Sequence, residues 1–292
     1  MLDAISYAIT YGHGLAIGKL GFSEQLTVLF YLACNRSSHP ESDPQIRPLS
    51  LALKYHFERQ TGVFPTDINF QIKYANFYVN KIIESDFLGL FNGLNERKFV
   101  SELPFKSKFI DYRDTEPDRS IPYNASTCYL PYFAKMKILL IAPFASFAMQ
   151  RSNKEIFESV WKKISMKWFY PASIQALDIP YGFFGQIKTF EQFENSINLY
   201  NDICSKIDKF DFDIALIAAG SLAIPLSVYI KQKKKVAISL GGHFQVLFGI
   251  LGERWLRDSF WCEHYINENW ARLPQQFIPA NPDIIADKKS YW

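Results

Sequence analysis

The stretch that decides the fold is residues 211–255, which read DFDIALIAAGSLAIPLSVYIKQKKKVAISLGGHFQVLFGILGERW. Residues 214–218 form a short, continuously apolar run, as expected of a strand that is covered on both faces. Gly220 interrupts this run, and the apolar spacing of residues 222–231 then predicts a helix. Residues 236–240 predict a second strand. Two strands joined by a crossover helix form a βαβ unit, so the stretch predicts a parallel sheet that binds ligands at the carboxyl ends of its strands.

Glycine turns follow both predicted strands of this unit. Glycine lets backbone N–H groups approach a phosphate closely, and the N-terminus of a following helix supplies partial positive charge. The alternative is that tight turns in a sheet need glycine for the backbone alone. Beside the turns, Gln245 can hydrogen-bond a base or a sugar. We assign ligand contacts to the turns and to two adjoining polar residues, namely Gly220, Ser221, Gly241, Gly242 and Gln245.

Four more polar side chains belong to the same stretch. His243 directly follows the second turn, where a histidine can act in catalysis or contact a donor, although a lone histidine in a turn is more often structural. Arg254 can neutralise a diphosphate with its planar guanidinium group. Asp211 and Asp213 have the spacing of an Asp-x-Asp metal motif, but they precede their strand. We therefore expect this pair at the amino edge of the sheet, in a structural role.

The composition is that of a globular protein with a large core. Of the 292 residues, 48% are hydrophobic and 16% are aromatic, so disorder is not expected. The net charge of +3 comes from interspersed acids and bases and gives no electrostatic argument for nucleic acid or an acidic membrane as a partner. We expect one α/β domain over residues 1–292, with residues 1–130 and 131–292 as candidate sub-lobes.

The cysteines, the N-terminus and the apolar runs indicate the cellular location of the protein. The four cysteines are far apart and form no CxxC pair, which predicts reduced thiols rather than disulfides or a zinc site. The N-terminus lacks the basic flank and the cleavage site of a signal peptide. The longest uncharged run, residues 214–230, is broken by Gly220 and Pro225 and predicts a strand and a helix rather than a membrane span. We therefore expect a cytoplasmic protein without a membrane span.

A further strand, turn and helix are predicted near the N-terminus. Residues 14–20 predict the strand, Gly21 the turn, and residues 24–32 a helix that Ser23 can cap. Glu24 has two interpretations, because a carboxylate in the first turn of a helix stabilises the helix dipole. At the carboxyl end of a strand, the same carboxylate can contact a metal, a phosphate or a sugar.

The rest of the chain alternates strands with helices. An apolar strand is predicted at residues 135–144, and helices are predicted at residues 2–11, 149–161 and 192–209. Residues 49–99 are mostly helical in pattern, which predicts a helical insertion in the N-terminal half. Residues 107–129 are rich in charge and turn residues, as in a surface loop near an active site or in a plain connector. Together these elements predict a Rossmann-like α/β fold with a mostly parallel sheet flanked by helices.

The P-loop, GxGxxG, GxSxG and HExxH signatures are absent from the sequence. Other segments carry a resemblance, namely GLAIGKLGFSE at residues 14–24, TGVFP at 61–65, KILLIAPF at 137–144, residues 212–255, NENW at 267–270 and a closing YW. In this order they resemble an uncharacterised family related to GT-D-type, DUF1792-like glycosyltransferases. The resemblance implies a nucleotide-sugar donor, a glycan or surface-polysaccharide acceptor, and usually a divalent metal such as Mn²⁺ or Mg²⁺.

The resemblance can be carried over residue by residue. After the first strand, GT-D enzymes have an arginine, a glycine and an Asp-x-Glu metal motif. The corresponding residues are Lys19, Gly21, Phe22 and Glu24, so Phe22 stands where the motif has an aspartate. Ser239 stands where similar relatives have a histidine before the LGG turn. The resemblance thus implies that Glu24 contacts the metal and that Lys19 and Gly21 belong to the donor site.

The sequence therefore predicts a glycosyltransferase that uses a nucleoside-diphosphate sugar. Glu24 and His243 are the predicted catalytic residues, and Lys19, Arg254 and the glycine turns are predicted to hold the donor. The alternative is a non-catalytic nucleotide- or glycan-binding protein with a degenerate glycosyltransferase fold, which Phe22 in the metal motif supports. A purely structural partner protein would have an apolar surface in place of a binding crevice.

Overall fold

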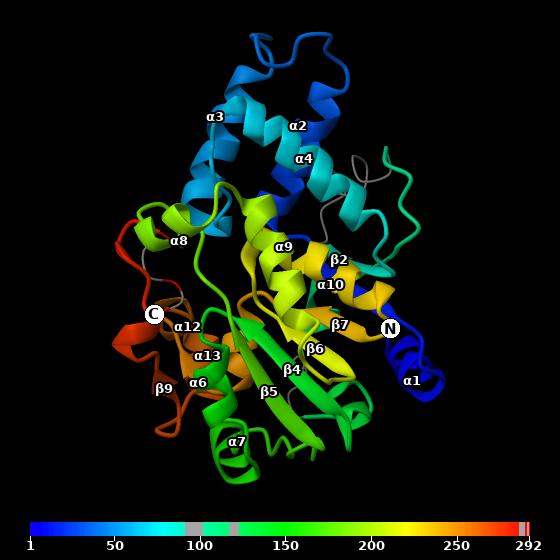
Figure 1. Cartoon of the computed structure of the whole chain (residues 1–292). Coiled ribbons are helices and arrows are strands. Elements are labelled where there is room, and N and C mark those ends of the chain that lie inside the picture. Colours follow the sequence, from blue (N-terminus) through cyan, green and yellow to red (C-terminus); the bar gives the residue numbers. More distant parts are fainter. Residues whose placement is uncertain (91–101, 117–122, 286–289, 291) are drawn as a thin grey trace.

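The centre of the computed structural model is a seven-stranded sheet in which every strand is parallel to its neighbours (Figure 1). The structure describes residues 1–90, 102–116, 123–285, 290 and 292. The strand order is β3-β2-β1-β7-β6-β4-β5. The strands are β1 (Leu15–Lys19), β2 (Phe87–Leu90), β3 (Lys108–Asp111), β4 (Lys137–Ala142), β5 (Ser173–Asp178), β6 (Ile214–Ile217) and β7 (Val236–Ser239). This sheet confirms the predicted Rossmann-like α/β fold.

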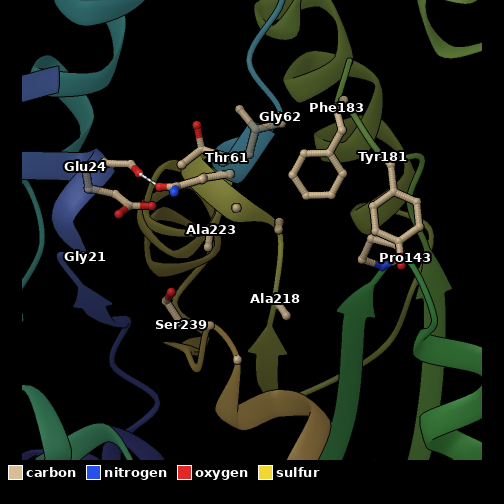
Figure 2. A pocket seen from close by; sticks show the side chains of 18 of the residues that line it. Gly21, Glu24, Thr61, Gly62, Pro143, Tyr181, Phe183, Ala218, Ala223 and Ser239 are labelled. Atoms are coloured by element: carbon tan, nitrogen blue, oxygen red, sulfur yellow. Dashed lines mark hydrogen bonds between the residues drawn. The ribbon is translucent and has the colours of Figure 1, made fainter. Parts of the chain in front are cut away.

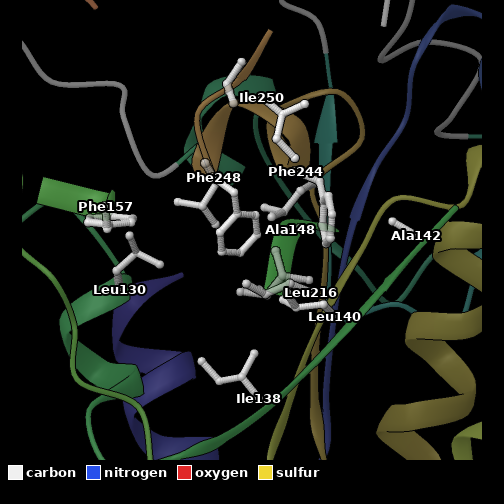
Figure 3. Close-up of a cluster of buried hydrophobic side chains, with 14 of the residues drawn as sticks. Leu130, Ile138, Leu140, Ala142, Ala148, Phe157, Leu216, Phe244, Phe248 and Ile250 are labelled. Carbon is white, nitrogen blue, oxygen red and sulfur yellow. The ribbon is translucent and has the colours of Figure 1, made fainter. Parts of the chain in front are cut away.

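Two hydrophobic cores cover the two faces of the sheet. Successive side chains of a strand point to opposite faces, so Ile138 and Leu140 of β4 belong to one core and Leu139 and Ile141 to the other. Figure 3 shows Ile138 and Leu140 in the first core. Its helices are α1 (Leu2–Tyr11), α6 (Ala145–Gln150), α7 (Lys154–Val160) and α11 (His243–Leu247). The second core includes α9 (Ser196–Ile207) and α10 (Ala223–Gln232). Burial on both faces explains why the central strands are apolar runs.

A helical insertion separates β1 from β2, as predicted. It consists of α2 (Phe22–Cys34), α3 (Arg47–His56), the π-helical η1 (Phe57–Thr61) and α4 (Ile68–Ile82). Asp67 caps α4 by accepting a hydrogen bond from the Phe70 backbone N–H at 3.0 Å. In Figure 1 the insertion rises above the carboxyl edge of the sheet. Residues 91–99 of the predicted helical region lie outside the described residues.

The C-terminal part of the chain contributes side chains to the first core. It contains β8 (Ile250–Leu251) paired in parallel with β9 (Ala271–Arg272), and the short helices α12 (Glu253–Leu256) and α13 (Ser259–His264). Trp292 is only 6% exposed, and its ring lies 6.2 Å from that of Tyr181. The remaining short elements are η2 (Tyr112–Thr115), η3 (Leu130–Phe133), α8 (Ile187–Gln192), η4 (Gly220–Leu222) and η5 (Gln275–Phe277). Within the described ranges, every helix is too short or too polar to span a lipid bilayer.

Several local predictions differ from the structure. Gly21, not Ser23, is the N-cap of α2, so the helix begins two residues earlier than predicted. The helix predicted at residues 149–161 is two helices, because Asn153 caps a new start by accepting a hydrogen bond from Ile156 N–H at 2.9 Å. The segment at residues 107–129 contains the edge strand β3 as well as a turn. An edge strand need not be apolar, which is why its composition resembles that of a loop.

The Asp-x-Asp pair lies at the amino edge of the sheet, as predicted. Asp213 Oδ2 accepts a hydrogen bond at 2.9 Å from the backbone N–H of Lys137, the first residue of β4. Asp211 forms an ion pair with the Lys137 side chain. These contacts tie the starts of two adjacent strands together, which is a structural role.

Candidate functional site

A pocket of about 320 Å³ lies at the carboxyl edge of the sheet, where open α/β sheets bind ligands. It is lined by residues that follow β1, β4, β5, β6 and β7 and by residues of the helical insertion. Figure 2 shows Glu24 and Gly21 on one wall, Tyr181 and Pro143 on the opposite wall, and Ala218 and Ser239 on the floor. Parallel strands bring these distant segments to a single edge.

Eight of the ten predicted site residues line this pocket. The junction of β1 and α2 contributes three of them, and the turns after β6 and β7 with their following segments contribute five. They are Lys19, Gly21, Glu24, Gly220, Gly241, Gly242, Gln245 and Arg254. Residues from both ends of the chain thus meet at one site.

Ser221 and His243 lie behind the pocket lining instead of in it. Ser221 is 2% exposed, and its Oγ accepts a hydrogen bond at 2.7 Å from the hydroxyl of Tyr74 in α4. The short η4 turn directs this side chain toward the insertion. His243 is also buried, with its ring 5.1 Å from that of Trp255. Both residues are therefore placed to support the site from behind.

The carboxylate of Glu24 folds back over the start of α2. Backbone N–H groups of Glu24 and Gly21 hydrogen-bond it, which is half of a capping box with Gly21 as the N-cap. Burial nevertheless raises the pKa of Glu24 to about 7, because the loss of solvent outweighs these two hydrogen bonds. Glu24 thus caps a helix and also borders the pocket, a position compatible with both interpretations.

Lys19 is held in a buried cluster of charged and aromatic groups. Its Nζ donates a hydrogen bond to Glu116 Oε1 at 2.9 Å and lies 3.9 Å from the centre of the Tyr112 ring. The Nδ1 of His243 lies 3.2 Å from the same Glu116 oxygen. Burial, with the nearby positive charges of Lys19 and Arg254, holds the pKa of His243 well below its usual range. The imidazole is therefore neutral near pH 7, and Glu116 offsets part of the Lys19 charge.

The glycines of the two turns meet different constraints. Gly220 and Gly241 both have positive φ angles, of 52° and 54°. A Cβ on Gly220 would lie 2.4 Å from the backbone oxygen of Thr61, so this glycine lets the turn pack against η1. A Cβ on Gly241 would meet no atom within 4 Å. Space beside the Gly241 backbone is therefore open to a ligand, whereas the Gly220 turn is closed by the insertion.

The insertion contributes pocket residues that the sequence did not single out as site residues. Ser23 Oγ donates a hydrogen bond to Gln60 Oε1 at 2.9 Å and lies 3.0 Å from His56 Nδ1. Ser23, Gln60 and Thr61 line the pocket together with Phe22. In the sequence, the TGVFP segment, which begins at Thr61, could have indicated these residues. The π-helix η1, a form that is frequent at functional sites, could not be predicted from the sequence.

The side chains at this site do not form a binding site for a divalent metal on their own. In the part of the chain that the structure describes, no three His, Cys, Asp or Glu side chains come together as metal ligands. Glu24 is the one carboxylate among the pocket-lining residues, and its oxygens already accept backbone hydrogen bonds. Magnesium is usually held by one or two carboxylates with phosphates and water. Glu24 would therefore be the single protein ligand of an ion held by donor phosphates and water, and we derive no step through a metal.

The fold and the pocket define an α/β protein with a pocket at the carboxyl edge of its sheet. A family model described as the GT-D fold-like domain matches residues 182–247, which include both glycine turns. This match relates the chain to GT-D-type glycosyltransferases and supports a glycosyltransferase-type function. Among curated proteins there is no match.

Two solved structures are similar to the chain. One is a selenomethionine-substituted domain of unknown function 1792, with 13% identity and a TM-score of 0.38. The other is described as a domain of unknown function 1792 with a distinct glycosyltransferase fold, with 14% identity and a TM-score of 0.40. Each comparison covers 94% of this chain and 100% of the other chain.

Proposed function

We propose that this protein transfers a sugar from a nucleoside-diphosphate sugar to a hydroxyl group of a glycan, such as a surface polysaccharide. The observation that carries the proposal is the arrangement of the pocket. A carboxyl group with a pKa near 7, Glu24, borders the same pocket as an open glycine turn at Gly241 and a guanidinium group, Arg254. A base on one side and diphosphate-binding groups on the other are what this reaction needs.

The donor diphosphate binds at the turn after β7 in this proposal. Gly241 and Gly242 expose backbone to the pocket, and the space beside Gly241 admits phosphate oxygens. Arg254 pairs with the negative charge that grows on the diphosphate as it leaves. Gln245 hydrogen-bonds the sugar or the base. Gly220 keeps the neighbouring turn close to η1 and so closes the pocket on that side.

Glu24 is the base in this mechanism. The acceptor hydroxyl oxygen attacks the anomeric carbon of the donor sugar, and the bond from that carbon to the phosphate oxygen breaks. The hydroxyl proton goes to the Glu24 carboxylate, and the nucleoside diphosphate leaves with the bonding electrons. A carboxyl group with a pKa near 7 suits proton transfer at neutral pH better than one with an ordinary pKa.

Lys19 and His243 support the leaving group from behind. Lys19 lines the pocket, and its ammonium, although paired with Glu116, adds to the positive charge supplied by Arg254. His243, which is neutral, contacts Lys19 and Glu116 rather than the pocket, so we assign it a positioning role. The four cysteines are free thiols, which agrees with the cytoplasmic, reducing location that we propose.

A second candidate function is binding without catalysis. The phenyl ring of Phe22 replaces a metal-motif carboxylate, and the Glu24 carboxylate is partly used to cap α2. A nucleotide- or glycan-binding protein with this pocket would bind the ligand and leave the sugar–phosphate bond intact. The two functions differ in turnover and not in binding.

The test combines binding with turnover. A thermal-shift screen of nucleoside diphosphates and their sugars, with EDTA or with Mn²⁺, measures binding, and release of nucleoside diphosphate measures turnover. We expect stabilisation by at least one donor in EDTA, slow donor hydrolysis by the wild type, and loss of hydrolysis in Glu24→Gln. Glu155→Gln is the matched control, because Glu155 is also a first-turn glutamate but lies outside the pocket. Binding without hydrolysis would favour the second function, and stabilisation only with Mn²⁺ would contradict metal-independent binding.

A further inference from the structure

Phe22 presents an exposed aromatic ring at the pocket wall that carries Glu24. It is the first residue of α2 and lines the pocket, yet 66% of its surface is accessible. Ligand pockets are commonly lined by aromatic side chains, so a ring at this position can contact a bound ligand. The ring belongs to neither hydrophobic core, so it is available to a ligand in the pocket.

The ring is supported from one side by the insertion. Its centroid lies 5.2 Å from that of the His56 imidazole, and the Tyr55 ring lies 5.6 Å from the same imidazole. His56 is in turn fixed by Ser23 Oγ at 3.0 Å. These contacts restrain the phenyl ring while leaving most of it accessible, and a restrained ring loses little side-chain entropy when a ligand packs against it.

Hydrogen-bonding groups lie next to the ring. Ser23 follows Phe22 directly, and its Oγ is hydrogen-bonded to the side chain of Gln60 at 2.9 Å. Both of these residues line the pocket. A hydroxyl and an amide each offer donor and acceptor capacity. An apolar face with a polar edge is complementary to a pyranose, which has C–H groups on a face of its ring and hydroxyl groups around its perimeter.

We propose that Phe22, Ser23 and Gln60 form the acceptor subsite and bind a pyranose. A C–H face of the sugar packs on the Phe22 ring, and its hydroxyls exchange hydrogen bonds with the Gln60 amide, which the buried Ser23 hydroxyl holds in place. The inference rests on the proposed function, because it takes the base to be Glu24, which shares the first helical turn with Phe22. Phe22 and Glu24 line the same pocket, so a sugar on this ring shares the pocket with the group that receives its proton, and the donor diphosphate occupies the turn at Gly241.

The experiment measures sugar binding by saturation-transfer NMR, with methyl β-D-glucopyranoside and methyl β-D-galactopyranoside as probes. D-glucitol is the flexible control, because it has similar hydroxyl groups and no ring face. We expect at least one pyranoside to bind with signal strongest at its ring C–H protons, and glucitol to show none. Phe22→Ala should weaken binding about tenfold, and Phe22→Trp should retain it, because the indole also offers an aromatic face.

Phe260→Ala is the matched control. Phe260 is 50% exposed and stacks on His264 with ring centroids 4.4 Å apart, but it lies outside the pocket. This variant should bind the pyranosides as the wild type does. Failure of every pyranoside to bind, or equal binding by wild type and Phe22→Ala, would overturn the subsite.

Nucleoside diphosphate binding, measured in parallel by thermal shift, separates this inference from the proposed function. The expected result is that Phe22→Ala leaves the stabilisation by nucleotides unchanged. If Phe22→Ala weakens nucleotide binding and not pyranoside binding, the ring stacks on the donor base and the acceptor subsite is wrong. If no nucleotide stabilises any variant, the proposed function itself fails, whatever the pyranosides do.

Discussion

The side chain of Glu24 occupies the space next to Gly21, so that a Cβ added to Gly21 would lie 2.6 Å from Glu24 Oε2. The φ and ψ angles of Gly21, −77° and 179°, are accessible to any residue. Glycine is therefore needed at this position for the carboxylate of Glu24 and not for the backbone. The glycine that follows β1 sets the place of the proposed base.

Gly21→Ala tests this relationship. The methyl group should displace the Glu24 carboxylate while the helix start keeps its backbone conformation. We expect turnover to fall about 100-fold, since small misplacements of a catalytic group have effects of this size. The melting temperature should change by only a few degrees, because about 1 kcal/mol corresponds to that shift. Wild-type turnover in a folded Gly21→Ala variant would show that the position of this carboxylate does not matter.

The Lys19–Glu116 ion pair predicts an effect on both stability and binding. Glu116→Gln leaves the buried ammonium of Lys19 without its carboxylate partner and should destabilise the fold by about 3–5 kcal/mol. Lys19→Met combined with Glu116→Gln should cost less than the sum of the single changes. Denaturant unfolding of the three variants measures this coupling.

Binding by the same variant gives an independent check. Because Lys19 borders the pocket, a nucleoside diphosphate can take over part of the role of Glu116. UDP should therefore raise the melting temperature of Glu116→Gln more than that of the wild type. An equal or smaller rise would mean that Lys19 does not reach the diphosphate.

Ser221 is predicted to matter for stability and not for binding. Ser221→Ala removes the acceptor of the Tyr74 hydroxyl and should cost about 1–3 kcal/mol of unfolding free energy. Adding Tyr74→Phe removes the stranded hydroxyl, so the double variant should recover part of that loss. Calorimetry measures the stabilities, and nucleotide titration of Ser221→Ala supplies the control. Weaker nucleotide binding with unchanged stability would instead place Ser221 in the donor site.

The raised pKa of Glu24 makes stability depend on pH with a definite sign. The unfolded chain loses this proton near pH 4.5, whereas the folded chain holds it until about pH 7. Protonation of Glu24 therefore stabilises the folded state at low pH compared with high pH. This contribution is fully present below pH 4.5 and is lost as the pH rises through 7. The loss approaches about 3 kcal/mol.

Comparison with Glu24→Gln isolates this effect from other titrating groups. The unfolding free energy of the variant relative to that of the wild type should increase between about pH 5 and about pH 8. Denaturant unfolding at several pH values measures the difference. A difference that stays constant over this range would mean that the carboxyl group titrates normally.

Strands and turns could be predicted from the sequence to different degrees, depending on how strongly burial or backbone geometry restricts the residue type. The doubly covered strands β4, β6 and β7 could be predicted because burial on both faces demands continuous apolar runs. The edge strand β3 could not, because it is largely exposed and its residues resemble those of a loop. The glycine turns could be predicted from residue type. The direction of the Ser221 side chain could not, because it depends on one turn of 3-10 helix.

The candidate site was predictable only where its residues follow strands. Lys19, Glu24 and Gly241 could be placed at a common edge because parallel strands end together. Glu116 and Gln60 reach the pocket region through an edge segment and a π-helix, whose positions depend on tertiary packing. Sequence spacing carries no information about such contacts, so the partner of Lys19 became visible only in the structure.

Release of nucleoside diphosphate from a panel of nucleotide sugars, with the methyl pyranosides as acceptors, tests whether this pocket transfers a sugar. We predict that the wild type turns over at least one donor and that Glu24→Gln does so about 10²- to 10⁴-fold more slowly. We also predict that both proteins bind that donor. If no donor is turned over, or if Glu24→Gln is as fast as the wild type, the assignment of this pocket as a glycosyltransferase site with Glu24 as its base is contradicted.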